Sequence, residues 1–471
     1  MTDSKKTTSR SSRRTFLGRS LLTLGGTAGL GAMGGLGAMH SLANASGYRP
    51  FGPSQRFFIF VYFSGGWDTL LSLDPRDPRD FHMGNLSDTL IQPAYDQLDD
   101  PGHIVDIIQA PNGITFGPYI GDLLAHADRM AVIRGMSMDT LTHEAGRRRF
   151  LTGKVPSGLL ARGSSASTWL ASQLGDGELI PQISVNVESY NVDQPEYASA
   201  LKVSNVPDLV RALEPAPSAL GDLEERQIDE LLQQAALCDH AAASPLWVAS
   251  EESRRGVSAM IEAQLAGHFD FQANDSNMEQ IRDHYGIAAS GIAALNTPEA
   301  QAAMAVTAIT SGISRVVSIR ANSVSLDTHF DEWATDQGPR QERGFNAIAR
   351  MVEDLGSRQF GDTSSSWLDH TTIVGFSEFS RTARLNANGG RDHALTNSCL
   401  LIGGGVKGGQ VIGRSSDVGI MPTKTNFTTG LPDEGGEVVK PEHVIRTLLV
   451  EAGVSEDLAD LRVEPLDALM K

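Results

Sequence analysis

The sequence predicts an α/β fold: a mainly parallel central sheet with helices on both faces, interrupted by a helical insertion. Two observations lead to this prediction. Short apolar runs of strand length alternate with helix-period segments, and polar or acidic residues stand immediately after several of the apolar runs. Parallel strands that are covered on both sides read as continuous apolar runs, and ligands bind beyond their carboxyl ends. The chain contains no internal repeats.

The composition narrows the classes of partner. The 471 residues carry a formal net charge of −18, with 40% hydrophobic and 20% charged residues. Residues 1–45 hold six basic residues and one acidic residue, a net of +5, which leaves −23 on the rest. Such an acidic surface repels phosphate backbones, so nucleic acid is not an expected partner. Two cysteines, Cys238 and Cys399, make neither a disulfide framework nor a thiolate metal motif, and their pairing stays open.

The N-terminus predicts export. Residues 12–18 (SRRTFLG) match the twin-arginine pattern, a Gly-rich apolar run spans 21–39, and Ala43-Asn44-Ala45 offers a cleavage site. A transmembrane anchor is the alternative, but the many glycines disfavour it. We therefore predict that residues 1–45 are a signal peptide for the twin-arginine export machinery. The mature domain, 46–471, is then periplasmic or secreted, without a stable membrane anchor after cleavage.

The first predicted strands each end near a polar residue. Residues 56–63 (RFFIFVYF) predict a central strand, and a Gly-Gly turn then leads to Asp68. Asp68 either stands at the strand mouth as a functional carboxylate or caps the next helix. Residues 130–134 predict a further strand, followed by Thr142 and His143 at the start of a helical segment. A helix N-terminus there favours an anion, although Thr142 is equally readable as an ordinary N-cap.

The middle of the chain changes in composition and in the period of its apolar residues. After a predicted strand at 183–187, residues 206–296 are rich in Ala, Gln, Glu and Leu at helical period, which predicts a helical insertion. The sheet pattern returns at 316–320, and Asp327 and His329 follow. Residues two apart in an extended segment point to the same side, so both side chains can face one ion.

The most informative stretch is 371–414. A buried strand is predicted at 371–376, with Glu378 at its carboxyl tip, and a Gly-rich loop then presents Arg391, Asp392 and His393 before a second apolar strand. Carboxylate and imidazole on one loop are what a divalent metal needs. Polar loop tips are usually only solvated, but the same residue types at other strand ends favour a metal site.

These residues carry a resemblance. The chain resembles the bacterial family of domain of unknown function 1501, which belongs to the alkaline phosphatase and sulfatase superfamily. The resemblance covers essentially the whole mature chain, most weakly in the insertion. The matching segments are the leader, the GGWD turn ending at Asp68, His143-Glu144 with Leu151-Thr152-Gly153, Asp327-Thr328-His329, residues 377–382 (SEFSRT), 389–393 (GGRDH) and 403–409 (GGGVKGG).

The resemblance implies a site with two divalent metal ions at the carboxyl edge of a parallel sheet. Zn, Mn, Fe and Ca all remain open, because the ligands include no thiolate. At the position of the superfamily's nucleophile this sequence has His143, with Thr142 adjacent and no cysteine available for modification. His143 is then a further ligand or a catalytic residue. The implied ligands are Asp68, His143, Asp327, His329, Glu378, Asp392 and His393.

Two functions follow as hypotheses. The first is a metal-dependent hydrolase of small anionic substrates, phosphate or sulfate esters, with Arg391 or Arg381 binding the anion and attack from Thr142 or a metal-bound hydroxide. The second is a non-catalytic exported envelope or binding protein that keeps the fold, with or without a structural metal. The missing Ser/Thr nucleophile motivates the second.

Overall fold

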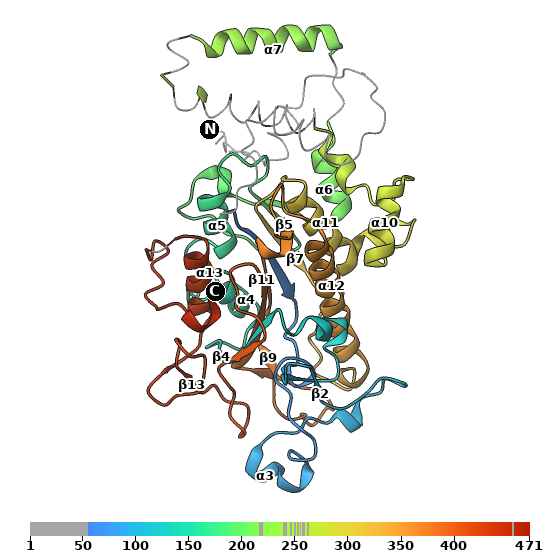
Figure 1. Cartoon of the computed structure of the whole chain (residues 1–471), viewed down its shortest axis with the longest axis vertical. Coiled ribbons are helices and arrows are strands. Elements are labelled where there is room, and N and C mark those ends of the chain that lie inside the picture. Colours follow the sequence, from blue (N-terminus) through green and yellow to red (C-terminus); the bar gives the residue numbers. More distant parts are fainter. Residues whose placement is uncertain are drawn as a thin grey trace, which may run out of the picture. The chain divides into compact units, whose positions relative to one another are not determined.

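A computed structural model describes residues 55–215, 220–238, 263–454 and 456–471, with isolated positions between 239 and 262. The chain divides into two compact units. One includes Leu209–Phe269, and the other, Pro50–Asp208 with Asp270–Lys471, contains the sheet (Figure 1). The predicted leader, 1–45, lies outside the described residues. Over the described part of the chain, no helix has both the length and the apolar character needed to cross a membrane.

The central sheet has eight strands, and all its neighbouring pairs are parallel except those made by β11. β11 runs antiparallel to both β4 and β8. This confirms the predicted mainly parallel sheet. In spatial order the strands are β12 (Gln410–Ile412), β4 (Met130–Ser137), β11 (Thr396–Gly403), β8 (Thr371–Ser377), β1 (Phe57–Phe63), β7 (Val316–Arg320), β5 (Gln182–Val185) and β6 (Leu201–Val203).

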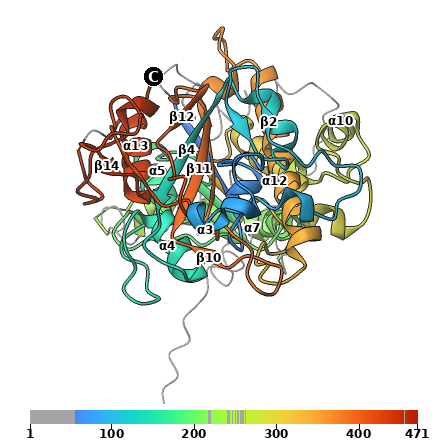
Figure 2. The ribbon, with the colours of Figure 1, turned by 90° about the horizontal axis from the view of Figure 1, so that it is seen from below.

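Helices cover both faces of the sheet, as the sequence predicts (Figure 2). On one face, α4 (His143–Thr152) brings Phe150 onto Phe376 of β8, with ring centroids 4.2 Å apart. On the other, α12 (Gly338–Ser357) brings Phe345 onto Phe63 of β1, with centroids 4.8 Å apart. The first layer also contains α5 (Ala166–Leu174) and α13 (Pro441–Glu451), and α11 (Pro298–Thr310) lies beside α12 in the second.

β1 is central because its sequence is apolar throughout. Every side chain of Phe57–Phe63 is buried, and the strand pairs with β8 and β7 on its two sides. Buried apolar area is the main stabilising contribution in folding, so this strand anchors both helix layers.

The predicted insertion, 206–296, holds helices where the structure describes it: α6 (Val206–Leu213), α7 (Asp222–Ala236) and α10 (Ser276–Tyr285). Residues 251–269 of the insertion fall mostly outside the described residues, except for a short 3₁₀ turn, Leu265–Phe269. The bounds of the insertion stay a prediction. The remaining elements are α3 (Leu86–Thr89) and the two-residue strand pairs β2 (Ile108–Gln109) with β3 (Thr115–Phe116), β9 (Ser380–Arg381) with β10 (His393–Ala394), and β13 (Lys424–Thr425) with β14 (Glu437–Val438).

The strand directions determine where the polar residues gather. β4, β7 and β8 run in one direction, so their carboxyl ends lie at one edge of the sheet. β11 runs the other way, so it begins at that same edge. The segments after β4, β7 and β8 and the segment before β11 therefore meet.

Candidate metal centre

Three imidazoles converge on one carboxylate oxygen at this edge. The Oδ1 atom of Asp327 lies 3.3 Å from Nε2 of His143, 3.1 Å from Nε2 of His329 and 3.4 Å from Nε2 of His393. His143 begins α4, Asp327 and His329 follow β7, and His393 lies in β10. The ligand atoms of His143, Asp327 and His393 all lie within 4.8 Å of one another.

Each ring is held by its other nitrogen. Nδ1 of His143 is 2.8 Å from Oε1 of Glu378, Nδ1 of His329 is 2.9 Å from Oδ1 of Asp392, and Nδ1 of His393 is 2.6 Å from the carbonyl oxygen of Leu141. Ionised carboxylates and carbonyls only accept hydrogen bonds, so we assign the proton of each neutral ring to Nδ1. Each Nε2 then presents a bare lone pair to the centre of the group.

Bare lone pairs do not attract one another. Nε2 of His329 lies 2.9 Å from Nε2 of His393, and both face the same oxygen of Asp327. A proton bridges one such pair only, whereas the ligand atoms of His143, Asp327 and His393 lie close enough together for one cation to contact all three. A metal-binding histidine typically donates its remaining N–H to a carboxylate or carbonyl, which is the arrangement of all three rings.

Arg381 is the cation that the chain itself supplies. Its side chain is fully buried, and Nη2 donates to Oδ1 of Asp327 at 2.7 Å while Nη1 lies 3.3 Å from Nε2 of His329. Burial alone raises the pKa of Asp327, but the hydrogen bond and charge of Arg381 outweigh it and lower the pKa to about 2. Asp327 is therefore ionised at any physiological pH.

Glu378 orients His143 from the tip of β8. Its side chain is 1% exposed, and Oε1 accepts from the backbone N–H of Gly65 at 2.7 Å as well as from His143. Burial raises the pKa of Glu378, but the hydrogen bond of His143 lowers it overall. Gly65 has φ +107°, and a Cβ there would meet the backbone nitrogen of Leu326 at 2.4 Å. Only glycine therefore lets the turn after β1 come this close.

The two other rings differ in their surroundings. Burial lowers the pKa of His393, which favours its neutral form. Asp392, beside His329, is more than half exposed, and Oδ1 also accepts from Nδ2 of Asn386 at 3.0 Å. The hydrogen bond from His329 lowers the pKa of Asp392.

The sequence was compared with protein-family models. A model described as "Protein of unknown function (DUF1501)" matches residues 55–430. The chain belongs to the DUF1501 family. The matched range contains the three imidazoles, Asp327 and the groups that hold them, and it confirms the resemblance carried by the motifs.

Other comparisons give distant matches to this DUF1501 protein. No curated protein matches its sequence significantly. A sulfatase, PsFucS1 from Pseudoalteromonas sp., is 11% identical over 93% of this chain and 75% of its own, with a TM-score of 0.34. The phosphonate monoester hydrolase SpPMH from Silicibacter pomeroyi is 13% identical over 85% of this chain and 73% of its own, with a TM-score of 0.31. At these scores neither assigns an activity to the DUF1501 protein.

A divalent cation of the kind that the resemblance implies fits this donor set. Imidazole nitrogen and carboxylate oxygen are ligands of divalent transition metals, and each ring is already held in the orientation and tautomer that binding requires. Burial lowers the pKa of His143, but its contacts with Glu378 and Asp327 raise the pKa overall. A proton therefore competes with a cation for Nε2 of His143.

The predicted ligands fall into three groups in the structure. His143, His329 and His393 each contact Asp327 directly. Glu378 and Asp392 reach the group through the imidazole rings they orient.

Asp68 lies elsewhere, fully buried. Its Oδ2 accepts from Nε1 of Trp333 at 2.8 Å and lies 2.9 Å from Nε of Arg391, while Oδ1 accepts from the N–H of Leu70. Over the part of the chain that the structure describes, its carboxylate makes no hydrogen bond or ion pair with the three imidazoles. The capping alternative is the geometry observed for Asp68.

Over the described residues, Arg391 and Thr142, predicted as catalytic residues, make no hydrogen bond or ion pair with the three imidazoles. Arg391 is fully buried: Nη1 donates to the carbonyl oxygen of Thr382 and Nη2 to that of Gln92, each at 2.7 Å. With its Nε beside Asp68, each nitrogen of the guanidinium has a partner within the protein. Thr142 is exposed at the N-cap of α4, 3.5 Å from the hydroxyl oxygen of Thr140. Its role as nucleophile stays a prediction.

Sequence reasoning missed three parts of this centre. Arg381 was only an alternative anion-binding residue, although it stands three positions after Glu378 in the same segment. Asn386 looked like an ordinary polar residue of a Gly-rich loop. The carbonyl of Leu141 has no side-chain signal at all, so only the fold reveals it.

Proposed function

We propose that this protein is an exported, metal-dependent hydrolase of small phosphate or sulfate esters. The observation that carries the metal dependence is the convergence of three Nε2 lone pairs on Oδ1 of Asp327, with every Nδ1 tied to an acceptor. The ester class rests on the family resemblance to the alkaline phosphatase and sulfatase superfamily. Export rests on the twin-arginine pattern at residues 12–18.

The donor set favours a transition metal over calcium. Three imidazoles and one carboxylate suit Zn or Fe, while Ca takes six to eight oxygen ligands. The sequence predicts two ions. The donors gather in one group rather than two. The guanidinium of Arg381, beside Asp327 and His329, supplies the positive charge that a second ion would supply there. We therefore propose one transition-metal ion at this group, with Arg381 beside it.

The chain's own residues prepare the site. Glu378, Asp392 and the Leu141 carbonyl fix the three rings, and Arg381 keeps Asp327 ionised. A bound cation supplies Lewis-acid polarisation of the ester and stabilises the negative charge that develops on its oxygens. The carboxylate of Asp327 is 39% exposed, so a small ester in solvent can reach the group.

A second candidate is a non-catalytic exported binding protein with a structural metal. One observation favours it. The position that the resemblance gives to the nucleophile is His143, and both nitrogens of this ring already face carboxylates, Glu378 and Asp327. A closed ligand shell indicates a structural site, whereas an open position indicates catalysis.

Elemental analysis tests both candidates. The protein is purified without chelator and its metal content per chain is compared with that of Asp327→Ala, Asp392→Ala and the exposed control Asp460→Ala. We expect about one transition-metal ion in the wild type and control, none in Asp327→Ala and reduced occupancy in Asp392→Ala. Hydrolysis of aryl phosphates and aryl sulfates that disappears with the metal supports the hydrolase. Full metal without turnover supports the binding protein. A wild-type chain that stays empty after reloading with Zn, Mn or Fe refutes both.

A further inference from the structure

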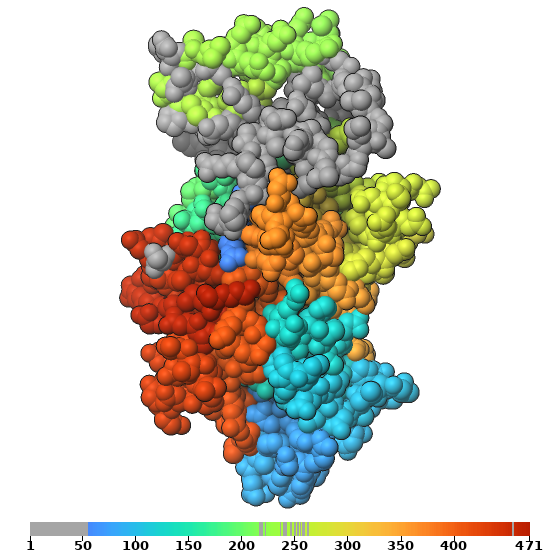
Figure 3. All heavy atoms as spheres, in the orientation of Figure 1, coloured from blue at the N-terminus to red at the C-terminus, as the bar shows by residue number. Residues whose placement is uncertain are grey.

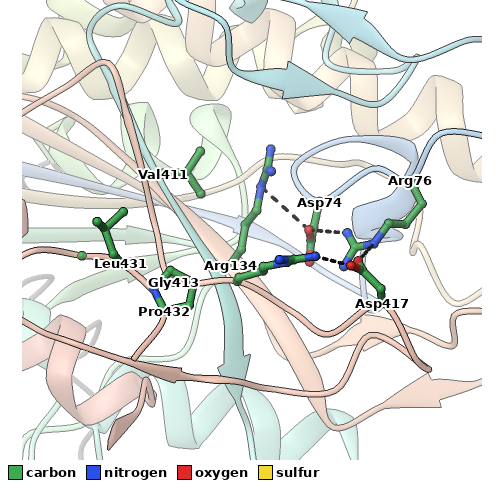
Figure 4. Close-up of a pocket in the computed structure, with 10 residues that line it drawn as sticks. Asp74, Arg76, Arg134, Val411, Gly413, Asp417, Leu431 and Pro432 are labelled. Atoms are coloured by element: carbon green, nitrogen blue, oxygen red, sulfur yellow. Dashed lines mark hydrogen bonds and ion pairs between the residues drawn. The ribbon is translucent and has the colours of Figure 1, made fainter. Parts of the chain in front are cut away.

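A second charged cavity lies where the loop after β1 meets the segment after β12 (Figure 4). The two segments lie side by side in Figure 3, blue against orange, and the N–H of Gly419 donates to the carbonyl of Thr89 at 2.8 Å. The cavity has a volume of about 480 Å³, within the range of about 300–1,000 Å³ that small-molecule sites occupy. Its charged lining consists of three arginines and two aspartates: Asp74, Arg76, Arg134, Arg414 and Asp417.

The carboxylates of Asp74 and Asp417 are already bound by side chains of the protein. Oδ1 of Asp74 accepts from Nη1 of Arg76 at 2.9 Å, and Oδ2 accepts from the hydroxyl of Ser415. Oδ1 of Asp417 accepts from Nε of Arg76 at 3.1 Å, and Oδ2 pairs with Arg414. Arg76 and Arg414 therefore account for both negative charges.

Arg134 is left with a surplus positive charge. Its side chain is 14% exposed, and Nε and Nη2 donate to the carbonyl oxygens of Leu73 and Thr115, each at 2.6 Å. Nε also forms an ion pair, at 3.8 Å, with Oδ1 of Asp74, the oxygen that accepts from Arg76, so the two arginines share this carboxylate (Figure 4). The third nitrogen, Nη1, makes no hydrogen bond with any described residue. Three arginines here share two aspartates, and a largely buried charge that is only partly compensated is costly, so the cavity has the chemistry of an anion site.

We propose that this cavity binds a small organic monoanion, with its oxyanion on Arg134 and its apolar part on the opposite wall. Guanidinium groups bind carboxylate and phosphate oxygens through short, charge-assisted hydrogen bonds. The apolar wall consists of Val411, Leu431 and Pro432, and Leu431 is 62% exposed at this position. The negative net charge of the chain disfavours a polyanion, so the ligand is small. This site is independent of the metal centre.

Titration calorimetry on the metal-loaded, full-length protein tests the proposal. The probes are benzoate and phenylphosphonate, with benzyl alcohol as the neutral control, all at constant ionic strength. We expect saturable binding of one anion per chain and none of the alcohol. Arg134→Gln should weaken binding about tenfold or more, because a charge-assisted hydrogen bond is lost. Arg79→Gln, which changes an exposed arginine paired with Asp77, should leave binding unchanged.

A second pair of variants avoids any change to the buried arginine. Leu431→Glu supplies a carboxylate at an exposed position and should abolish anion binding without lowering the melting temperature, whereas Leu431→Gln should retain it. The stronger probe identifies the oxyanion as carboxylate or phosphate. No saturable binding to the wild type overturns the proposal, as does binding that Arg134→Gln and Leu431→Glu leave intact. Phenylphosphonate binding that only Asp327→Ala removes belongs to the metal centre and also overturns it.

Discussion

Glu378→Gln tests whether the buried carboxylate at the tip of β8 orients a metal ligand. The substitution keeps the shape of the side chain, and the amide oxygen still accepts from Gly65 and His143. The negative charge beside Nδ1 of His143 makes the ring a stronger metal ligand, and the substitution removes this charge. Losing such a supporting carboxylate typically costs about 10–100-fold in metal affinity, or about 1.4–2.7 kcal/mol.

The assay is competition between the protein and a chromophoric chelator for Zn²⁺ at pH 7.5. The matched control is Glu188→Gln, which removes a carboxylate that pairs with Arg147 and Arg148 and makes no hydrogen bond to the three imidazoles over the described part of the chain. We expect Glu188→Gln to bind Zn²⁺ like the wild type, and Glu378→Gln to bind about 10–100-fold more weakly. An affinity within twofold of the wild type in a folded Glu378→Gln protein would refute the orienting role.

Three further predictions concern stability and packing. Burial raises the pKa of Glu451 to about 7 despite its ion pair with Arg56, so between pH 4.5 and pH 7 the native state keeps a proton that the unfolded chain has lost. The free energy of unfolding therefore falls as pH rises from 4.5 to 7. Urea unfolding should show Glu451→Gln to be about 3 kcal/mol more stable than the wild type at pH 8 and little changed at pH 4. Burial lowers the pKa of His443 to about 4, so the stability that the neutral ring contributes is complete above pH 6.5 and is lost as pH falls towards 4. Between pH 6.5 and pH 4, His443→Asn should lose about 3 kcal/mol less free energy of unfolding than the wild type. An equal loss in variant and wild type would contradict the reasoning. A Cβ on Gly146 would meet the carbonyl oxygen of Glu378 at 2.4 Å, so Gly146→Ala should cost about 1–3 kcal/mol in urea unfolding and weaken Zn²⁺ binding, whereas the control Gly356→Ala, whose Cβ meets only side chains at 3.8 Å, should be neutral or stabilising.

The sheet was predictable because its strands are marked by continuous apolar sequence. Residues 56–63, 130–134, 316–320 and 371–376 each contain or overlap an observed strand, since a strand covered on both faces needs apolar side chains throughout. The peripheral strands β6 and β12 were not predicted. They are three residues long and mix polar with apolar side chains, so no periodic signal marks them.

The site was predictable only where chemistry and local spacing coincide. The Asp327/His329 spacing predicts two side chains facing one ion, and the structure places their ligand atoms 3.1 Å apart. For Asp68 the same reasoning left two alternatives. The structure shows the cap, in the N–H of Leu70, and a second donor, Trp333, that stands 265 residues further along the chain, and nothing in the sequence shows that its indole N–H reaches Asp68.

The reversed direction of β11 has a consequence for how this family can diversify. The chain leaves the sheet after Ser377 and re-enters it at Thr396 on the same edge, without a helix that crosses either face. Insertions and deletions between these points therefore leave both helix layers intact, and loops of this kind tolerate changes in length. Glu378 stands at one end of the loop, directly after β8, and His393 stands near the other, in β10, where it pairs with Arg381 of β9. Evolution or a protein engineer can exchange residues 383–385 and 387–389 to change what reaches the centre, provided that Asn386, which donates to Asp392 and to the carbonyl oxygen of His329, is kept.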